Sequence, residues 1–122
     1  MKKFILIILS AISIAANAED WQFVGSSNDG VEYYKPSSVV RDGNVIKFWV
    51  LFDLNKPAKS GILSAVNYEE LDCVDKKQRT LQSQNYFSSG GKGDPGKSFG
   101  AASWDYVIPG TLTEVLMNRL CR

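Results

Sequence analysis

The chain has 122 residues, with 14 basic side chains, 13 acidic side chains and no histidine. This near balance of charge argues against a nucleic-acid-binding protein, which usually carries a strong basic excess or a basic stripe. The lack of histidine excludes a Ser-His-Asp catalytic arrangement and removes the commonest metal ligand. We therefore expect no cofactor and no metal.

The N-terminal segment has the layout of a secretory signal peptide. Lys2 and Lys3 precede an apolar run over residues 4–9, and a small-residue pattern, Ala-Asn-Ala, occupies residues 16–18. The apolar run is too short to span a bilayer comfortably. We expect cleavage after Ala18 and export to the periplasm, the outer surface or the medium. Since no cysteine stands near the cleavage point, no lipid anchor is expected.

Removal of residues 1–18 leaves 104 residues, with 12 basic and 13 acidic side chains. This length is sufficient for one small domain, residues 19–122, with a modest core. The strand-like patterns described next cover most of that domain.

Two hairpins are predicted at the start of the domain. Residues 21–24 and 31–35 are short aromatic and β-branched runs separated by a polar turn. An Asp-Gly pair at residues 42–43 then marks a tight reversal before residues 46–54. Every even position of residues 46–54 is apolar and the odd positions are mixed. This alternation predicts a strand with one core face and one half-wet face.

Two further strands are predicted over residues 63–74 and 79–87, paired antiparallel across a charged turn. In the first of them the apolar residues change from even to odd positions after Tyr68, which indicates a bulge or a twist. Residues 88–98 contain four glycines and a proline, so a loop is expected there. One more short strand is expected near residues 104–108.

The chain is expected to end in an amphipathic helix. Pro109 and Gly110 break the preceding strand, and Thr111 and Glu114 have the spacing of a capping box. The apolar stripe of this helix consists of Leu112, Val115, Leu116 and Leu120. Together, the elements predict an α+β fold with an antiparallel sheet of about five to six strands and one C-terminal helix.

Cys73 and Cys121 are the only two cysteines, and in an oxidising compartment the default is a single disulfide bond. The bond would tether the C-terminal helix to the sheet and close a loop of 48 residues. Such a loop closure stabilises a fold by about 4 kcal/mol. The rival interpretation, a catalytic thiol, requires a basic partner, and histidine is absent.

One segment imitates the phosphate-binding P-loop. Gly91, Gly96, Lys97 and Ser98 have its spacing, and Asp53 at the end of an apolar strand resembles the Mg²⁺-binding aspartate of such proteins. A working P-loop needs a buried parallel strand before it and a helix after it. The pattern predicts neither here, so we expect no nucleotide binding.

Four carboxylates, Glu69, Glu70, Asp72 and Asp75, lie close together in the sequence. Alternation places Glu70 and Asp72 on one strand face and Glu69 on the other, and EF-hand spacing is missing. We interpret the group as a solvated strand end and expect no enzyme activity. A third hypothesis is that the protein is a small hydrolase that uses these carboxylates. In that case Asp72→Asn would inactivate it.

Aromatic side chains with nearby basic residues are enriched in protein interfaces. The candidate partner-binding residues chosen on this basis are Tyr33, Lys35, Trp49, Lys56 and Lys59.

Several short motifs follow one another in a recognisable order. They are Trp21, Val24-Gly25, residues 31–35, Gly43, Trp49-Val50, Leu71-Asp72-Cys73, Arg79, the glycine-rich segment, Trp104, Pro109-Gly110 and Cys121. This order resembles the surface-adhesin protein E family of Gram-negative bacteria. The resemblance implies an antiparallel sheet with a C-terminal helix held by a Cys73–Cys121 bridge.

The resemblance also implies binding of host extracellular proteins, with vitronectin, laminin and plasminogen as partners, and a homodimer. The best-known member is lipid-anchored, whereas this chain lacks the acceptor cysteine. The alternative function is that of a periplasmic envelope protein or a lysozyme inhibitor acting on an internal partner. The Ser-Gly-x-x-Tyr loop of one inhibitor family is missing, because Gly91, Lys92 and Gly93 follow Ser89-Gly90.

Overall fold

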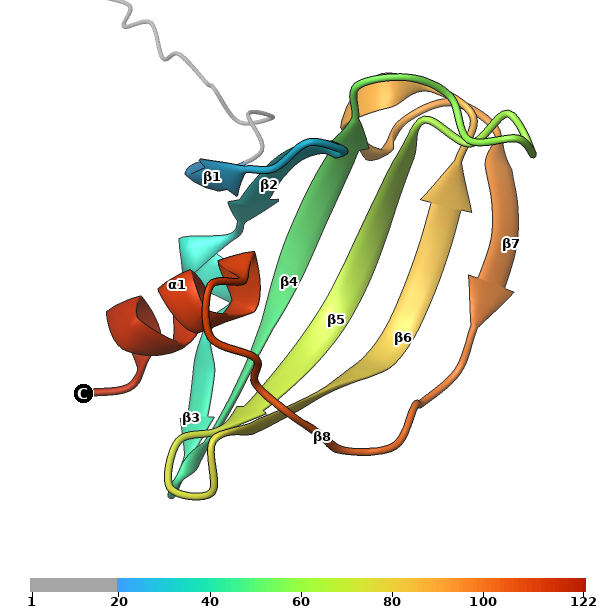
Figure 1. Ribbon diagram of the computed structural model, residues 1–122. Helices are drawn as coiled ribbons and strands as arrows, with labels where there is room; N and C mark the ends of the chain where they lie inside the picture. The colour runs from blue at the N-terminus through green and yellow to red at the C-terminus, as the bar shows by residue number, and fades with distance from the viewer. Residues whose placement is uncertain (1–19) are drawn as a thin grey trace, which may run out of the picture.

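The computed structural model describes residues 20–122 and shows one antiparallel sheet with a C-terminal helix, α1, on one side (Figure 1). The eight strands are β1 Gln22–Ser26, β2 Gly30–Tyr34, β3 Val40–Asp42, β4 Val45–Leu54, β5 Ser64–Asp72, β6 Lys77–Tyr86, β7 Pro95–Phe99 and β8 Asp105–Tyr106. The helices are α1 Leu112–Leu120 and the 3-10 turns η2 Pro36–Ser38 and η3 Ser89–Gly91. The predicted fold class is confirmed, with more strands than the five to six expected. The expected signal peptide lies outside the described residues.

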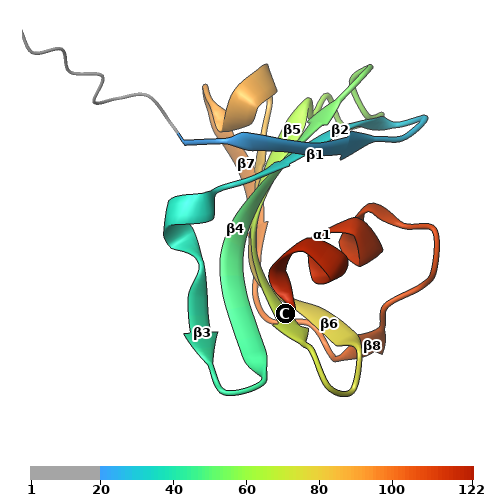
Figure 2. The same ribbon diagram turned by 90° about the vertical axis from the view of Figure 1, so that its left-hand side faces the viewer.

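The strand order β1-β2-β4-β5-β6-β7 makes β4, β5 and β6 the interior of the sheet. One edge of β4 is shared by β2 and β3, and one edge of β6 is shared by β7 and β8. The backbones of β4, β5 and β6 are therefore paired on both sides over most of their length. In Figure 2 the β1–β2 hairpin crosses one end of the sheet at a steep angle to β4.

The predicted alternation of residues 46–54 is confirmed in β4. Ile46, Phe48 and Val50 are buried on the face that α1 covers, which is called the helix face below. Trp49 points to the opposite face, called the outer face. Figure 2 shows α1 on one side only of β4, β5 and β6. The core consists of Val24, Tyr34, Ile46, Phe48, Val50, Leu71, Leu116, Met117 and Leu120.

Both predicted hairpins are present. The tight reversal between β3 and β4 uses Gly43, whose φ of +64° favours glycine. The predicted irregularity after Tyr68 is also confirmed, because the β5–β6 register shifts between Tyr68 and Glu69. Tyr68 faces Gln82 and Glu69 faces Thr80, so the extra residue of this bulge is on β6 and not on β5.

The expectation of a loop over residues 88–98 is wrong, since this segment contains η3 and most of β7. Backbone pairing to β6 makes β7 a strand although its side chains lack an apolar alternation. Pro95 is tolerated because it is the first residue of an edge strand. The short strand expected over residues 104–108 is confirmed only at Asp105–Tyr106.

Helix α1 begins as predicted. The Thr111 hydroxyl accepts a hydrogen bond from the Glu114 amide at 3.3 Å, and Glu114 Oε1 accepts one from the Gly110 amide at 2.9 Å. The buried stripe differs from the predicted one, because Met117 is buried and Val115 is 39% exposed. The face of α1 that meets the sheet carries Leu116, Met117 and Leu120, and Val115 lies beside it.

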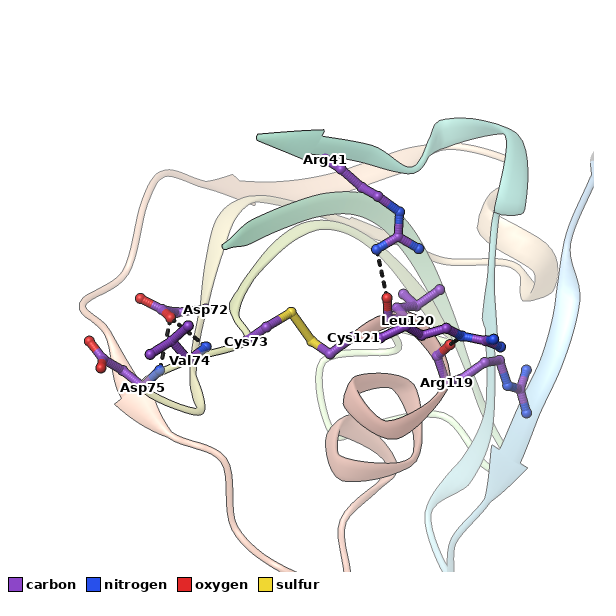
Figure 3. The surroundings of a disulfide bond; sticks show 9 residues. Arg41, Asp72, Cys73, Val74, Asp75, Arg119, Leu120 and Cys121 are labelled. Atoms are coloured by element: carbon purple, nitrogen blue, oxygen red, sulfur yellow. Dashed lines mark hydrogen bonds between the residues drawn. A yellow bond between two sulfur atoms is a disulfide. The ribbon is translucent and has the colours of Figure 1, made fainter. Parts of the chain in front are cut away.

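The predicted disulfide bond joins Cys73, just after β5, to Cys121, which ends α1, with a Cα–Cα distance of 5.6 Å (Figure 3). Arg41 Nη1 donates to the Leu120 carbonyl at 2.7 Å and so ties the same helix end to β3. Arg119 Nη1 in the last turn also donates to the Phe23 carbonyl of β1 at 3.2 Å, so the end of α1 is fixed to the sheet by one covalent bond and two hydrogen bonds.

Candidate functional site

A groove of about 450 Å³ opens on the outer face of the sheet. Its floor comes from β4, β5 and β6, and its walls come from the residues just before β1 and after β2 and from η3. The groove is lined by Trp21, Lys35, Trp49, Val66, Gln82, Gln84, Tyr86, Gly90, Gly91 and Lys92. Its volume is typical of small-ligand sites, which usually occupy roughly 300–1,000 Å³.

Trp49 is fixed at the floor of the groove. It lies opposite Tyr68 on β5, and the two rings are 4.7 Å apart between centroids with an interplanar angle of 34°. Such tilted stacking contributes about 0.5–1.5 kcal/mol beyond the area it buries. Because β4 and β5 are interior strands, the indole ring is held on a rigid backbone.

Lys35 and Trp21 form one wall. The Lys35 amide donates to the Trp49 carbonyl at 3.0 Å, which extends the pairing of β2 with β4 by one residue. The Nζ atom of Lys35 lies 4.9 Å from the centroid of the Trp21 ring, a cation–π distance. The structure therefore brings the predicted candidates Lys35 and Trp49 together, and Tyr33 is on the same face of the sheet.

The opposite wall is η3, which folds back onto the sheet. The Gly90 amide donates to Asp53 Oδ1 at 2.6 Å, and the Gly91 amide donates to Ser64 Oγ at 2.9 Å. A Cβ atom on Gly91 would lie 2.6 Å from Val66 Cγ2, and the φ of Gly91 is +68°. Glycine is therefore required at residue 91 for both space and conformation.

The residues that imitate a P-loop have a different role in this geometry. Two amides of the glycine-rich segment are bound to side chains of the sheet, and Asp53 is one of the acceptors. Lys97 and Ser98 lie in β7 and do not begin a helix. The segment builds the wall of the groove, in an arrangement without the strand–loop–helix context of a P-loop.

Two glutamine side chains project from β6 into the groove. The Nε2 atom of Gln84 donates to the carbonyls of Asn85 and Gly96, both at 3.0 Å. These bonds use the two amide protons, so Gln84 offers its oxygen to a ligand. Gln82 is exposed and can both donate and accept.

The charges that line the groove are all positive. Lys35 and Lys92 are its ionisable basic residues, and none of the lining residues is a carboxylate. Lys92 is exposed and, within residues 20–122, forms no ion pair. The groove therefore favours a ligand with negative charge.

Lys56 and Lys59 are not part of this groove. Lys56 lines a separate hollow beside Asn28 and Asp29, and Lys59 is exposed in the loop between β4 and β5. The eight lining residues other than Lys35 and Trp49 are not among the candidates predicted from the sequence: Trp21, Val66, Gln82, Gln84, Tyr86, Gly90, Gly91 and Lys92. Alternation in residues 79–87 could have placed Gln82, Gln84 and Tyr86 on one face, because all three are even-numbered.

The acidic residues are split between environments, as the alternation predicted, but the interpretation of a solvated strand end is wrong for Glu69 and Glu70. Glu70 is only 7% exposed and accepts a hydrogen bond from Arg79 Nε at 2.7 Å on the outer face. The Arg79 guanidinium in turn lies 4.6 Å from the centroid of the Trp104 ring. Asp72 Oδ1 accepts bonds from the amides of Val74 and Asp75, so it stabilises the β5–β6 turn.

Glu69 lies on the helix face and, with Glu32 of β2, lines a cavity of about 220 Å³ between the sheet and α1. Burial raises the pKa of Glu32 from 4.5 to about 7, and the negative charge of Glu69 adds to the effect. Burial also raises the pKa of Glu69, although hydrogen bonds from Thr80 and Asn67 oppose the shift. These two carboxylates face an apolar surrounding that includes Phe48 and Leu116.

Within residues 20–122, no group of three or more His, Cys, Asp or Glu side chains is placed to hold a metal ion. In the same part of the chain, no helix has the length and apolar character needed to cross a membrane.

Comparison with known proteins decides the family. The sequence model for surface-adhesin protein E matches residues 21–122. The chain belongs to this family. No curated protein matches it in sequence.

Solved structures of Haemophilus influenzae protein E share the fold. Crystal form II of that protein has a TM-score of 0.66 at 13% identity, and the match covers 96% of each chain. A second structure has a TM-score of 0.63 at 15% identity, covering 93% of this chain and 90% of the other. The protein from a non-typeable strain has a TM-score of 0.62 at 15% identity, covering 93% and 82%. At these identities the likeness extends to the fold.

Proposed function

We propose that this adhesin-family protein is exported and binds host extracellular proteins through the outer face of its sheet, without a catalytic step. The observation that carries the proposal is the groove described above, in which the aromatic rings of interior strands lie beside lysines of the walls. Aromatic residues supply much of the binding energy of protein interfaces, and a preformed site loses little conformational entropy on binding.

The partners that we propose are vitronectin, laminin and plasminogen, which the family resemblance suggests. Tyr33 and Phe23 extend the outer face beyond the groove, with their rings packed edge to face at 6.2 Å between centroids. Phe23 is 56% exposed. A protein partner would therefore contact both the groove and this aromatic pair.

Solid-phase binding tests the proposal. The exported protein, with its disulfide bond intact, is titrated onto each of the three immobilised proteins at physiological salt. Saturable binding is expected to at least one of them, and Trp49→Ala is expected to weaken it at least tenfold, since central aromatic anchors often contribute about 2 kcal/mol or more. Lys76→Ala, a change at an exposed residue in the turn between β5 and β6 and outside the groove, serves as the control. Failure to bind any of the three would sink the proposal.

The location is tested separately. We propose cleavage of the signal peptide after Ala18 and display at, or release from, the outer surface of the cell. Protease treatment of intact cells should remove a tagged copy of the protein while a periplasmic marker survives. Protection until the outer membrane is opened would favour the periplasmic alternative, and a lysozyme activity assay would then test the inhibitor function.

We also propose that two copies pair through β1, which is the free edge next to β2. Unpaired edge strands promote association between sheets. Light scattering of the purified protein should give the mass of a dimer. A charged side chain at the edge, in Phe23→Lys, should shift the mass toward that of a monomer.

A further inference from the structure

We infer that the outer-face groove binds an acidic saccharide, meaning a sugar unit that carries a carboxylate or a sulfate group. This inference rests on the proposed function in taking the groove as the contact site. It adds the chemical class of the ligand, which neither the fold nor the family specifies. Three properties of the groove support it: ring faces, oriented amides and positive charge.

The ring faces come first. A sugar ring has one face rich in C–H groups, and this face packs well on an aromatic ring whose electron density is concentrated above its plane. Trp49 is partly exposed at the floor, and Tyr68 supports it from the neighbouring strand at 4.7 Å. Trp21 and Tyr86, also partly exposed, stand on the two sides of the floor. The groove thus offers one platform and two flanking rings for a flat, partly apolar ligand.

The amides supply the second property. Sugar hydroxyls both donate and accept, so they are recognised by fixed groups of both kinds. Gln84 is locked by its bonds to the carbonyls of Asn85 and Gly96 and presents its oxygen as an acceptor. Gln82, two residues earlier on the same face, adds an exposed amide that can donate. This combination suits hydroxyl groups better than an aliphatic side chain.

The charge is the third property. Lys92 stands at the η3 wall and Lys35 at the wall opposite, and among residues 20–122 no carboxylate lines the groove. Lys35 is already in contact with the Trp21 ring, so Lys92 is the ammonium group assigned to the acidic group of the sugar. A neutral sugar would gain nothing from this residue.

An extended peptide is a poorer fit to the same groove. Peptides that bind to sheets usually add a strand to an open edge and gain main-chain hydrogen bonds. The floor here belongs to β4 and β5, whose backbones are paired on both sides, and to β6, which is paired with β5 along its length and with β8 and β7 at its two ends. Apart from Gly90 and Gly91 of the η3 wall, the lining residues therefore meet a ligand through their side chains, which favours a compact ligand rich in hydroxyl groups.

Calorimetry and intrinsic fluorescence test the inference on the exported protein with its disulfide bond intact. The probes are 3′-sialyllactose, which carries a carboxylate, a heparin-derived tetrasaccharide, which carries sulfates, and neutral lactose. Saturable binding of at least one charged probe is expected, with lactose at least tenfold weaker. Binding of sialyllactose alone would identify the acidic group as a carboxylate, and binding of the heparin fragment alone as a sulfate. Saturation by neither, or equal binding of lactose, would overturn the inference.

Variants locate the binding. Lys92→Glu should weaken binding of the charged probe at least tenfold, and Lys76→Glu, an exposed lysine in the turn between β5 and β6 and outside the groove, should change it less than twofold. Trp49→Ala should abolish binding and Trp49→Phe should restore part of it, because the ring face is kept. Trp104 lies outside the groove, so the fluorescence change should persist in Trp104→Phe. Binding that Lys92→Glu leaves unchanged would place the site elsewhere and contradict the inference.

The two proposals fail in different ways. If no saccharide binds while the host proteins still bind in a Trp49-dependent manner, the saccharide inference is wrong and the proposed function stands. If a charged saccharide binds but none of the host proteins does, the saccharide inference stands and the proposed function is wrong.

Discussion

Glu69 and Glu70 are neighbours in β5, and the two faces of the sheet give their carboxylates opposite surroundings. On the outer face, Glu70 is held by Arg79, which also stacks on Trp104. On the helix face, Glu69 accepts hydrogen bonds from the Thr80 hydroxyl and the Asn67 side chain but shares its cavity with a second carboxylate, Glu32. One step along the chain separates a compensated negative charge from an uncompensated one.

The difference teaches how this small fold separates stability from binding. On the outer face the buried charge is paired and the amides at η3 are bonded to Asp53 and Ser64, so the groove rests on a satisfied framework. On the helix face, the cavity beneath α1 is lined by two carboxylates, Glu32 and Glu69, whose pKa values are raised. The stability of the helix face should depend on pH, whereas the shape of the groove should not.

The largest loss of stability is expected when the disulfide bond that holds α1 to the sheet is removed. The double substitution Cys73→Ser with Cys121→Ser removes a bond that spans 48 residues. We expect a loss of about 4 kcal/mol in the free energy of unfolding, from the greater entropy of the unfolded chain. Urea denaturation of the variant beside the oxidised wild-type protein measures the loss, and the reduced wild-type protein, which should behave like the variant, is the control. A loss below about 1 kcal/mol would show that core packing holds α1 without the bond.

The next largest loss of stability is expected from breaking the ion pair between Arg79 and Glu70 on the outer face. Arg79→Ala leaves Glu70 buried without its cation and should cost about 3 kcal/mol. Adding Glu70→Gln to that variant should restore much of the loss, because a neutral amide has less need of a cation. Thermal denaturation of the two variants beside wild type checks both. If the double variant were no more stable than the single one, the loss would come from the packing of Arg79 on Trp104 and not from charge.

Glu32→Gln tests the pH dependence of the helix face. Since the folded-state pKa of Glu32 is about 7 against an ordinary 4.5, wild-type stability is full below pH 4.5 and falls as the pH rises through 7. Allowing for partial contact with solvent, we expect the variant to be about 2 kcal/mol more stable than wild type at pH 8. The two should differ little at pH 4. Urea denaturation at both pH values measures this, and an equal gain at both would contradict the titration.

The smallest effect is expected at the start of α1. Thr111→Ala removes the hydroxyl that accepts the Glu114 amide and should cost about 1 kcal/mol. Because Thr111 is far from the groove lining, probe binding by the folded variant should stay within twofold of wild type. Weakened binding would show that the two faces of the sheet are coupled.

Much of the fold could be predicted because its signals are local. The alternation in β4, the Asp-Gly reversal at Gly43 and the Thr111–Glu114 cap each depend on residues close in sequence. β7 could not be predicted in this way. It forms through backbone pairing to β6, which leaves no side-chain pattern to recognise.

The groove depends on register and was only partly predictable. Trp49 and Lys35 were chosen from composition, but their meeting with Gln84 and Lys92 requires the pairing of three strands and the return of η3 onto Val66. The proximity of Glu32 and Glu69 in one cavity also depends on register, since the two residues come from β2 and β5, on either side of β4. Neither arrangement has a signal within a single segment.

The bond between Cys73 and Cys121 makes β6, η3, β7, β8 and α1 parts of one covalent ring. The exposed residues 92–95 lie inside that ring. A protease that cuts there would open the ring without releasing a fragment, since each half keeps one of the bonded cysteines. The nicked protein would differ from the intact one by a single added water molecule, and the two halves would separate only after reduction. A protein cut once in this segment would thus remain one molecule.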